Sequence, residues 1–292
     1  MRFLAPILAL CASLLATTTP SLAGAQVDVP LEWSGGRTAL RVTVDGAGAP
    51  LLATFDTGAQ GITIRRSVAE HLGLPVVGEV LMGSPLGGQP IPVKLVALPS
   101  LRVGGVAAKE APHSLDAALV DDAHMLAGTD LVIGPNQFPQ ALIELGLAQQ
   151  RFRLKEAPGA AANDWLPTNS RGLLETELLL GEHRVSVYLD TGKPGLIDLP
   201  RRMARGLNLL TALKSVGKAR VVGREIDVEG AEFRGLLTVA GVRFTYAGEL
   251  RFADIPVAVV GTDALRQSVI RIDTANHRWQ LQPPASQTMG SL

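Results

Sequence analysis

LLATFDTGAQGITI, from Leu51 to Ile64, and VSVYLDTGKPGLIDL, from Val185 to Leu199, are the two stretches that decide the fold. Each places the tripeptide Asp-Thr-Gly directly after an apolar run that is typical of a β-strand. At average residue usage a given tripeptide is expected about once in several thousand positions. Two copies in matching surroundings therefore indicate a repeated structural unit.

A second pair of matching blocks occurs later in the chain. LVIGPNQFPQALIELGLAQQRFRL covers Leu131–Leu154, and AVVGTDALRQSVIRIDTANHRWQL covers Ala258–Leu281. They align without a gap over most of their length and place Gly134 on Gly261. The repeat period of about 130 residues is far longer than that of a solenoid and predicts two homologous lobes.

Short helices are expected after the Asp-Thr-Gly segments. SVAEHLGL, Ser67–Leu74, is amphipathic and has Ser67 as an N-cap candidate. PRRMARGLNL, Pro200–Leu209, begins with a proline that suits a first helical position. Elsewhere, short apolar runs broken by Gly and Pro predict all-β lobes of the barrel or sandwich type.

The order of these elements resembles that of the retropepsin-like aspartic proteases. It reads apolar strand, Asp-Thr-Gly, strand, helix, hairpins, two apolar residues with Gly, and final strands, twice between Val27 and Pro283. The chain looks like a single-chain, two-lobed bacterial member of that group. The resemblance implies two homologous retropepsin-like β-barrel lobes, each with a short helix, and a cleft between them.

The expected domains follow from these repeats. They are a signal peptide at 1–25, an N-terminal lobe at 26–157, a linker at 158–170, a C-terminal lobe at 171–285 and a tail at 286–292. The linker belongs to a stretch without hydrophobic periodicity that is rich in Ala, Pro and Asn.

Asp56 and Asp190 are the candidate catalytic residues. Two carboxylates about 3 Å apart cannot both ionise, so such a pair shares a proton and works as base and acid together. The resemblance implies one Asp from each lobe, with a water between them and no metal or cofactor. The alternative is that each Asp forms a turn at a strand end, which two aligned copies make less attractive than one would.

The neighbours of these aspartates have expected supporting roles. The resemblance implies that the hydroxyls of Thr57 and Thr191 form hydrogen bonds across the interface and lock the two loops together. Gly58 and Gly192 are expected to allow a tight turn and to bring main-chain N–H groups to the carboxylates. Such hydrogen bonds favour the charged form of the pair.

The residue after each Asp-Thr-Gly differs between the two copies. The family usually has Ala or Ser there, as Ala59 is in the first copy, whereas the second copy has Lys193. Both are candidates to line the cleft. The Lys193 ammonium could point into the cleft, where it would keep both carboxylates ionised at lower pH, or swing out to solvent on its flexible stem.

Other positions are expected to be structural or to cover the cleft. MGSPLGGQ, Met82–Gln89, is a candidate covering hairpin with Gly87 and Gly88 at its tip, and Val222–Ile226 is its candidate counterpart. Both segments also fit ordinary hairpin turns. The aligned glycines of the later blocks are expected to pack under the active loops. Three further aspartates are expected at the surface or in turns: Asp130, Asp263 and Asp273.

The first 25 residues have the features of a secretory signal. Arg2 precedes an apolar run from Phe3 to Leu15, and Ala23-Gly24-Ala25 forms a small-x-small cleavage site. The apolar run is shorter than the ~20 residues that a membrane-spanning helix needs. Cys11, the single cysteine, would leave with this signal, so no disulfide is expected in an exported mature protein.

Composition excludes several function classes. The formal net charge is zero, from 27 basic and 27 acidic residues, and no basic stripe favours nucleic acid. The five histidines lack metal-ligand spacing, and neither a phosphate-binding loop nor Gly-x-Ser-x-Gly occurs. The sequence therefore favours a periplasmic or secreted monomeric aspartic endopeptidase that takes an extended peptide. The alternative is a peptide- or protein-binding protein of the same fold, in which Lys193 marks lost catalysis.

Overall fold

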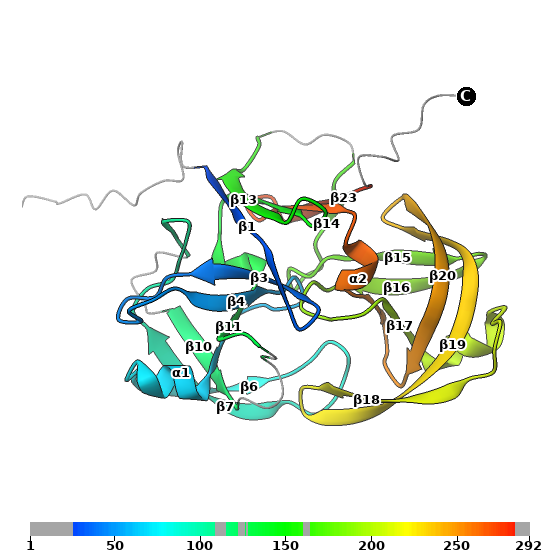
Figure 1. Cartoon of the computed structure of the whole chain (residues 1–292), viewed down its shortest axis with the longest axis horizontal. Coiled ribbons are helices and arrows are strands. Elements are labelled where there is room, and N and C mark those ends of the chain that lie inside the picture. Colours follow the sequence, from blue (N-terminus) through cyan, green and yellow to red (C-terminus); the bar gives the residue numbers. More distant parts are fainter. Residues whose placement is uncertain (1–25, 109–114, 122–125, 127, 160–163, 284–292) are drawn as a thin grey trace, which may run out of the picture.

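The computed structural model describes residues 26–108, 115–121, 126, 128–159 and 164–283. These residues form three large sheets, one from the first half of the chain, one from the second half, and one to which both halves contribute (Figure 1). Helical structure in the described residues is limited to short segments of three to six residues. The prediction of an all-β fold is confirmed.

The first-half sheet has eight strands in the order β2-β3-β4-β11-β5-β10-β7-β6. Its central strand β11 runs parallel to β4 and antiparallel to β5. A two-stranded hairpin of β8 (Arg102–Val103) and β9 (Val106–Ala107) lies outside this sheet. The strands are β2 Glu32–Ser34, β3 Arg37–Val42, β4 Leu51–Phe55, β5 Ile62–Arg65, β6 Val76–Met82, β7 Ile91–Leu98, β10 Leu115–Val120 and β11 Leu131–Ile133.

The second-half sheet repeats the central arrangement. β21 lies between β16, to which it is parallel, and β17, to which it is antiparallel, as β11 lies between β4 and β5. The full order is β15-β16-β21-β17-β20-β19-β18. The strands are β15 Glu175–Leu180, β16 His183–Leu189, β17 Ile197–Pro200, β18 Lys214–Val221, β19 Arg224–Val239, β20 Val242–Ala253 and β21 Ala258–Val260.

The third sheet joins the halves in the order β1-β13-β12-β22-β23-β14. β12 and β22 pair antiparallel with Glu144 opposite Arg271, which occupy the same position in the two aligned blocks. These strands are β1 Val27–Pro30, β12 Ala141–Gly146, β13 Arg151–Glu156, β14 Leu166–Pro167, β22 Val269–Asp273 and β23 Arg278–Gln282.

Reciprocal contacts flank this junction. The Leu147 amide donates to the Ser268 carbonyl at 3.1 Å, and the Thr274 amide donates to the Ala141 carbonyl at 3.0 Å. Leu147 aligns with Thr274 and Ser268 with Ala141, so the two bonds are equivalents of each other. This is the relation that an approximate two-fold axis produces.

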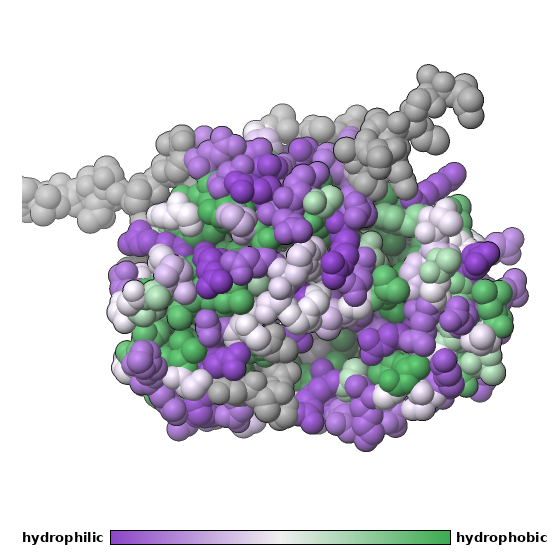
Figure 2. All heavy atoms as spheres, viewed as in Figure 1, coloured by the Kyte–Doolittle hydropathy of each residue, from purple (hydrophilic) through white to green (hydrophobic). Residues whose placement is uncertain are grey.

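Buried apolar side chains from both halves form one continuous cluster. It includes Phe55 and Phe152, whose ring centroids are 5.0 Å apart, and the fully buried Phe252 and Trp279. Phe55 directly precedes Asp56, so the core holds the strand that presents this carboxylate. Figure 2 shows hydrophilic and hydrophobic side chains interspersed over the viewed face.

Two helix predictions need correction. The first helix, α1, spans Arg66–His71, and its N-cap position is Arg65, so Ser67 lies within the helix and is not its cap. Pro200 is the last residue of β17, with a ψ of 131° that is not helical, and the 3-10 helix η2 (Arg201–Gly206) follows it. Local patterns miss these boundaries because pairing of β5 and β17 extends each strand up to the helix.

Two further short helices were not predicted. The 3-10 helix η1 spans Pro135–Gln137, and α2 spans Thr262–Leu265. Within the predicted linker, β14 pairs with β23 of the third sheet. No helix among the described residues is long and apolar enough to cross a membrane. The predicted signal peptide with Cys11, the tail at 286–292, His113 and His124 lie outside the described residues.

Candidate functional site

The two Asp-Thr-Gly loops meet between the halves. Asp56 follows β4, and its amide donates to the Ile133 carbonyl of β11 at 2.9 Å. Asp190 follows β16, and its amide donates to the Val260 carbonyl of β21 at 3.0 Å. The two partly buried carboxyl groups are hydrogen-bonded to each other. Residues separated by more than a hundred positions in the sequence are thus brought into direct contact.

Four hydrogen bonds of the two threonines, two to each other and two to the strands before the loops, lock these loops together. The Thr57 amide donates to the Thr191 hydroxyl, and the Thr191 amide donates to the Thr57 hydroxyl, each at 3.1 Å. The Thr57 hydroxyl donates to the Leu189 carbonyl and the Thr191 hydroxyl to the Phe55 carbonyl, each at 2.7 Å. Both threonines are almost fully buried. The arrangement is the reciprocal one that the family resemblance implied.

Gly58 and Gly192 lie against the carboxylates. Their amides donate to Asp56 Oδ1 at 2.6 Å and to Asp190 Oδ1 at 2.9 Å. A Cβ on Gly58 would lie 3.1 Å from Asp190 Cγ, and one on Gly192 would overlap the Asp56 carboxyl group. Neither glycine has a positive φ, so the expected need for a special turn conformation is not the reason for glycine here. The reason is space for the opposing carboxyl group.

The two carboxyl groups differ in their proton affinity. Burial and the nearby Asp190 charge raise the pKa of Asp56 well above its usual value, against the lowering effect of the Gly58 amide. Burial also raises the pKa of Asp190, but the hydrogen bond from Asp56 and the charge of Lys193 oppose that increase. The two carboxyl groups titrate as one coupled pair, and the charge of Lys193 acts on the Asp190 side of that pair.

The Lys193 ammonium does not swing out to solvent, which was one of the two orientations considered from the sequence. Its Nζ lies 3.3 Å from Asp198 Oδ2 and donates to the Pro194 carbonyl at 3.2 Å. The side chain is only 13% exposed, so the ammonium is held against β17 rather than in solvent. It remains close enough to lower the pKa of Asp190.

The aligned glycines Gly134 and Gly261 lie directly beneath the two loops. A Cβ on Gly134 would overlap the Ala59 carbonyl, and one on Gly261 would lie 2.5 Å from the Gly195 carbonyl. Ala59 also packs on a small apolar cluster together with Met82 at the end of β6. This contact places the base of the first-half hairpin beside the first loop.

The tips of the two candidate covering hairpins touch each other. Arg224 of β19 donates from Nη2 to the Leu86 carbonyl at 3.1 Å. A Cβ on Gly88 would lie 2.7 Å from the Val222 carbonyl, and one on Gly87 would lie 3.4 Å from Arg224 Nη2. Both glycines have positive φ, 88° for Gly87 and 103° for Gly88. Figure 1 shows the β6–β7 and β18–β19 hairpins meeting along one edge of the molecule.

Three residues near the loops were missed by the sequence analysis. Arg37 begins β3, and its charge lowers the pKa of both aspartates. The Thr38 hydroxyl donates to the Phe55 carbonyl at 2.7 Å. Of these three residues, only Asp198 could have been noticed in the sequence, because it is an acidic residue within the apolar strand LIDL.

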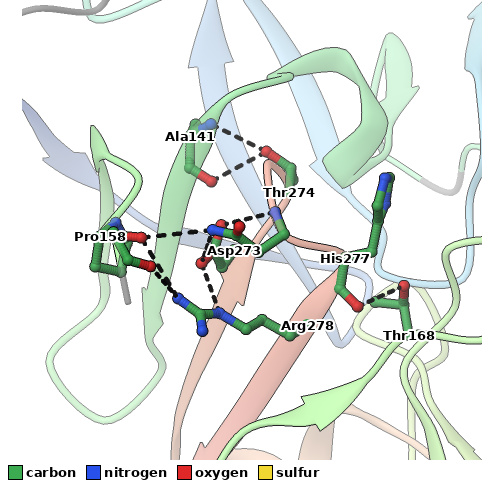
Figure 3. A network of polar contacts seen from close by, with 9 residues as sticks. Ala141, Pro158, Thr168, Asp273, Thr274, His277 and Arg278 are labelled. Carbon is green, nitrogen blue, oxygen red and sulfur yellow. Dashed lines mark hydrogen bonds and ion pairs between the residues drawn. The ribbon is translucent and has the colours of Figure 1, made fainter. Parts of the chain in front are cut away.

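The remaining aspartates have structural partners. Asp130 accepts the Leu52 amide at 2.9 Å, and Asp263 pairs with Arg266 at 2.7 Å. Asp273 is fully buried and has the second of the two expected positions, because its carboxylate stabilises a turn. Its carboxylate pairs with Arg278 at 2.7 Å and accepts from Asn276 (Figure 3). Figure 3 also shows that this network reaches the main chain near Pro158.

Among the described residues, no group of three or more His, Cys, Asp or Glu side chains could hold a metal ion. What the site offers chemically is a pair of hydrogen-bonded carboxyl groups on two interlocked loops, which can hold one proton between them. This is the arrangement needed for general acid–base work on a bound water.

Part of the first half of the chain matches the model of a known protein family. Residues 40–135 match the family model described as aspartyl protease. The matched segment begins within β3, contains Asp56 and the β6–β7 hairpin, and ends at the start of η1. No curated protein matches the chain. The match supports an aspartic protease family for this protein.

Proposed function

We propose that the protein is an aspartic endopeptidase in which Asp56 and Asp190 act as one catalytic dyad. The family match supports protease activity in general. The observation that carries the dyad proposal is the direct hydrogen bond between the two carboxyl groups on loops interlocked by Thr57 and Thr191.

The proposed reaction begins with a water bound between the carboxyl groups. Asp190 takes a proton from this water as its oxygen adds to the carbonyl carbon of the peptide bond, while Asp56 gives its proton to the carbonyl oxygen. In the resulting gem-diol, Asp190 passes its proton to the amide nitrogen and Asp56 recovers one from a hydroxyl. The C–N bond then breaks into an acid and an amine, and the dyad again holds one proton.

The proposed substrate is an extended segment of peptide. Peptides bound as strands gain affinity from main-chain hydrogen bonds and specificity from alternating side-chain contacts. The touching hairpin tips support this proposal, because a peptide beside the aspartates would pass beneath a bridge to which both halves contribute. The tips would separate to admit the extended peptide and would exclude bulk solvent from it when closed.

We further propose that the active species is an exported monomer. One chain supplies both aspartates, and the reciprocal contacts of β12 and β22 support an internal duplication. The apolar stretch ending at Ala25 supports cleavage and export to the periplasm or the medium. Cell fractionation and N-terminal sequencing test this, with Gln26 as the expected first residue, and light scattering tests the monomer.

The experiment that tests the enzyme proposal uses the chain from Gln26 onward and an unfolded protein substrate. Cleavage measured by mass spectrometry from pH 3 to 8 is expected to resist chelators and to be blocked by a hydroxyl-bearing transition-state mimic. Asp56→Asn, Asp190→Asn and the double variant are each expected to lose activity by about 10³-fold or more, with no further loss in the double. Asp121→Asn, at an exposed ion pair, is the control.

Two results would contradict the proposal. Roughly additive, partial losses in the single variants would exclude a shared-proton dyad. Absence of cleavage at every pH, with peptide binding retained in both wild type and variants, would favour the alternative binding function.

A further inference from the structure

A cluster of three charged side chains lies behind the second loop. Asp198 of β17 is placed between Lys193, 3.3 Å away, and Arg251 of β20, 3.4 Å away. The side chains of Lys193 and Asp198 are 13% and 14% exposed, so this pair is largely withdrawn from solvent. Charges in such positions interact more strongly than exposed ones, because water screens them less.

The strand register shows which residues occupy these places in the first half. Asp198 pairs with Val259 of β21, and Thr63 pairs with Val132 of β11. Since Val132 aligns with Val259 in the repeated blocks, Thr63 is the structural equivalent of Asp198.

The same comparison extends to the other two members of the cluster. Arg251 lies beside Asp198 in the parallel β17–β20 pair, and Ala118 lies beside Thr63 in the parallel β5–β10 pair. Lys193 follows Asp-Thr-Gly where the first loop has Ala59. The first half therefore has no charged side chain at any of the three positions, and the cluster makes the two loops electrically unequal.

We propose that Lys193 is a positioning residue whose ammonium, held by Asp198, makes Asp190 the ionised base and leaves the proton on Asp56. This inference rests on the proposed function, and it assigns the two chemical roles within the dyad. Two carboxyl groups in symmetric surroundings would share the proton without preference, whereas a cation behind one loop stabilises the charge of that loop's carboxylate. Asp198 limits the effect by balancing the ammonium.

The charges that face the dyad come from several elements. Arg37 of β3 lowers the pKa of both aspartates and therefore does not distinguish them. Lys193 lowers that of Asp190 specifically. Tyr246 of β20 is neutral at working pH, because burial, Glu249 and Asp198 raise its pKa to about 12. The geometry agrees, because Lys193 follows Asp190 by three residues and its largely buried Nζ would lie 3.1 Å from a Cβ on Gly261, beneath the same loop.

The first test is the pH dependence of kcat/KM in charge variants. Lys193→Met keeps the length and removes the charge, so the pKa of Asp190 should rise and the acidic limb should move upward by about half to one pH unit. Asp198→Asn leaves the ammonium unbalanced and should move that limb downward. In the Lys193→Met background the Asp198→Asn change should have a smaller effect. Lys193→Arg should restore the wild-type limb, and Arg184→Met, at an exposed ion pair with Glu177, is the control.

The second test needs no substrate. Titration of the aspartate carboxyl carbons by NMR in the apo protein should show the Asp190 signal ionising at higher pH in Lys193→Met and at lower pH in Asp198→Asn, with Asp190→Asn assigning the signal. Lys193→Gln gives the same readout if Lys193→Met does not fold.

The outcomes separate this inference from the proposed function. Shifted titrations in a protein without peptidase activity would remove the enzyme proposal and leave the electrostatic assignment intact. An active enzyme whose pH limb and carboxyl titration do not change in the Lys193 and Asp198 variants would overturn the inference alone.

Discussion

The two Asp-Thr-Gly loops share a backbone but differ in the side chains behind it. The Ala59 amide donates to the Asp56 carbonyl at 3.2 Å, and the Lys193 amide donates to the Asp190 carbonyl at 3.3 Å. The threonines and glycines that shape and join the loops are identical in both copies. The contrast between a neutral first loop and a charged second loop teaches that contacts between the loops restrict their shape, while the residues behind them set their charge.

The sheet that joins the halves shows the same principle. Glu144 and Arg271 occupy equivalent positions and face each other across β12 and β22, with Arg271 Nε 3.0 Å from Glu144 Oε2. In a dimer of identical halves this position would place two like charges opposite each other, which is destabilising. A single chain permits unlike residues at equivalent positions, and this protein uses that freedom both at the junction and behind the second loop.

The largest loss of activity is expected when a methyl group is added to each loop glycine in turn. In Gly192→Ala the new Cβ overlaps the Asp56 carboxyl group, so activity should fall by about 100-fold or more. In Gly58→Ala the nearest atom is 3.1 Å away and small shifts suffice, so a loss of about tenfold or less is expected. Steady-state kinetics with a fluorogenic peptide measures both. Equal losses would show that the two glycines are not under unequal constraint.

A smaller effect is expected at the hairpin tips, where the first half supplies Leu86 and the second half Arg224. Arg224→Ala removes the donor to the Leu86 carbonyl and should raise KM several-fold while changing kcat little, because the aspartates are untouched. Leu86→Ala keeps the carbonyl but removes the side chain that packs near Ile226, and should act in the same direction. A fall in kcat without a change in KM would assign the tips a role in the chemical step.

The smallest expected effect is on stability, where the two carboxyl groups should contribute unequally. The pKa of Asp56 is higher in the folded than in the unfolded protein. The stabilisation that comes from its protonated form is therefore full below the unfolded pKa, near 3.9, and is lost as the pH rises through the folded pKa. Asp56→Asn should therefore stabilise the protein by about 1 kcal/mol at pH 7 and by little near pH 3. Asp190→Asn should gain less, since Lys193 favours its charge. Urea unfolding at pH 3 and pH 7 measures these free energies. Equal stabilisation by the two variants would contradict the inference that Lys193 favours the charge of Asp190.

The sequence by itself determined the strands, the two loops and their glycine supports. Asp-Thr-Gly after an apolar strand and the aligned Gly134 and Gly261 are local patterns, and duplication made each pattern visible twice. The contact between Asp56 and Asp190 was predicted from the family resemblance, which implies that each half supplies one aspartate to a shared site.

Only the tertiary structure decided the surroundings of the second loop. Whether Lys193 reaches Asp198 depends on the path of the loop, and Arg251 joins them through a strand that lies far away in the sequence. The helix start at Arg66 and the strand end at Pro200 likewise depend on pairing within the sheets. Local patterns specify which residues can form an element, whereas charge partners and boundaries depend on what the fold brings beside them.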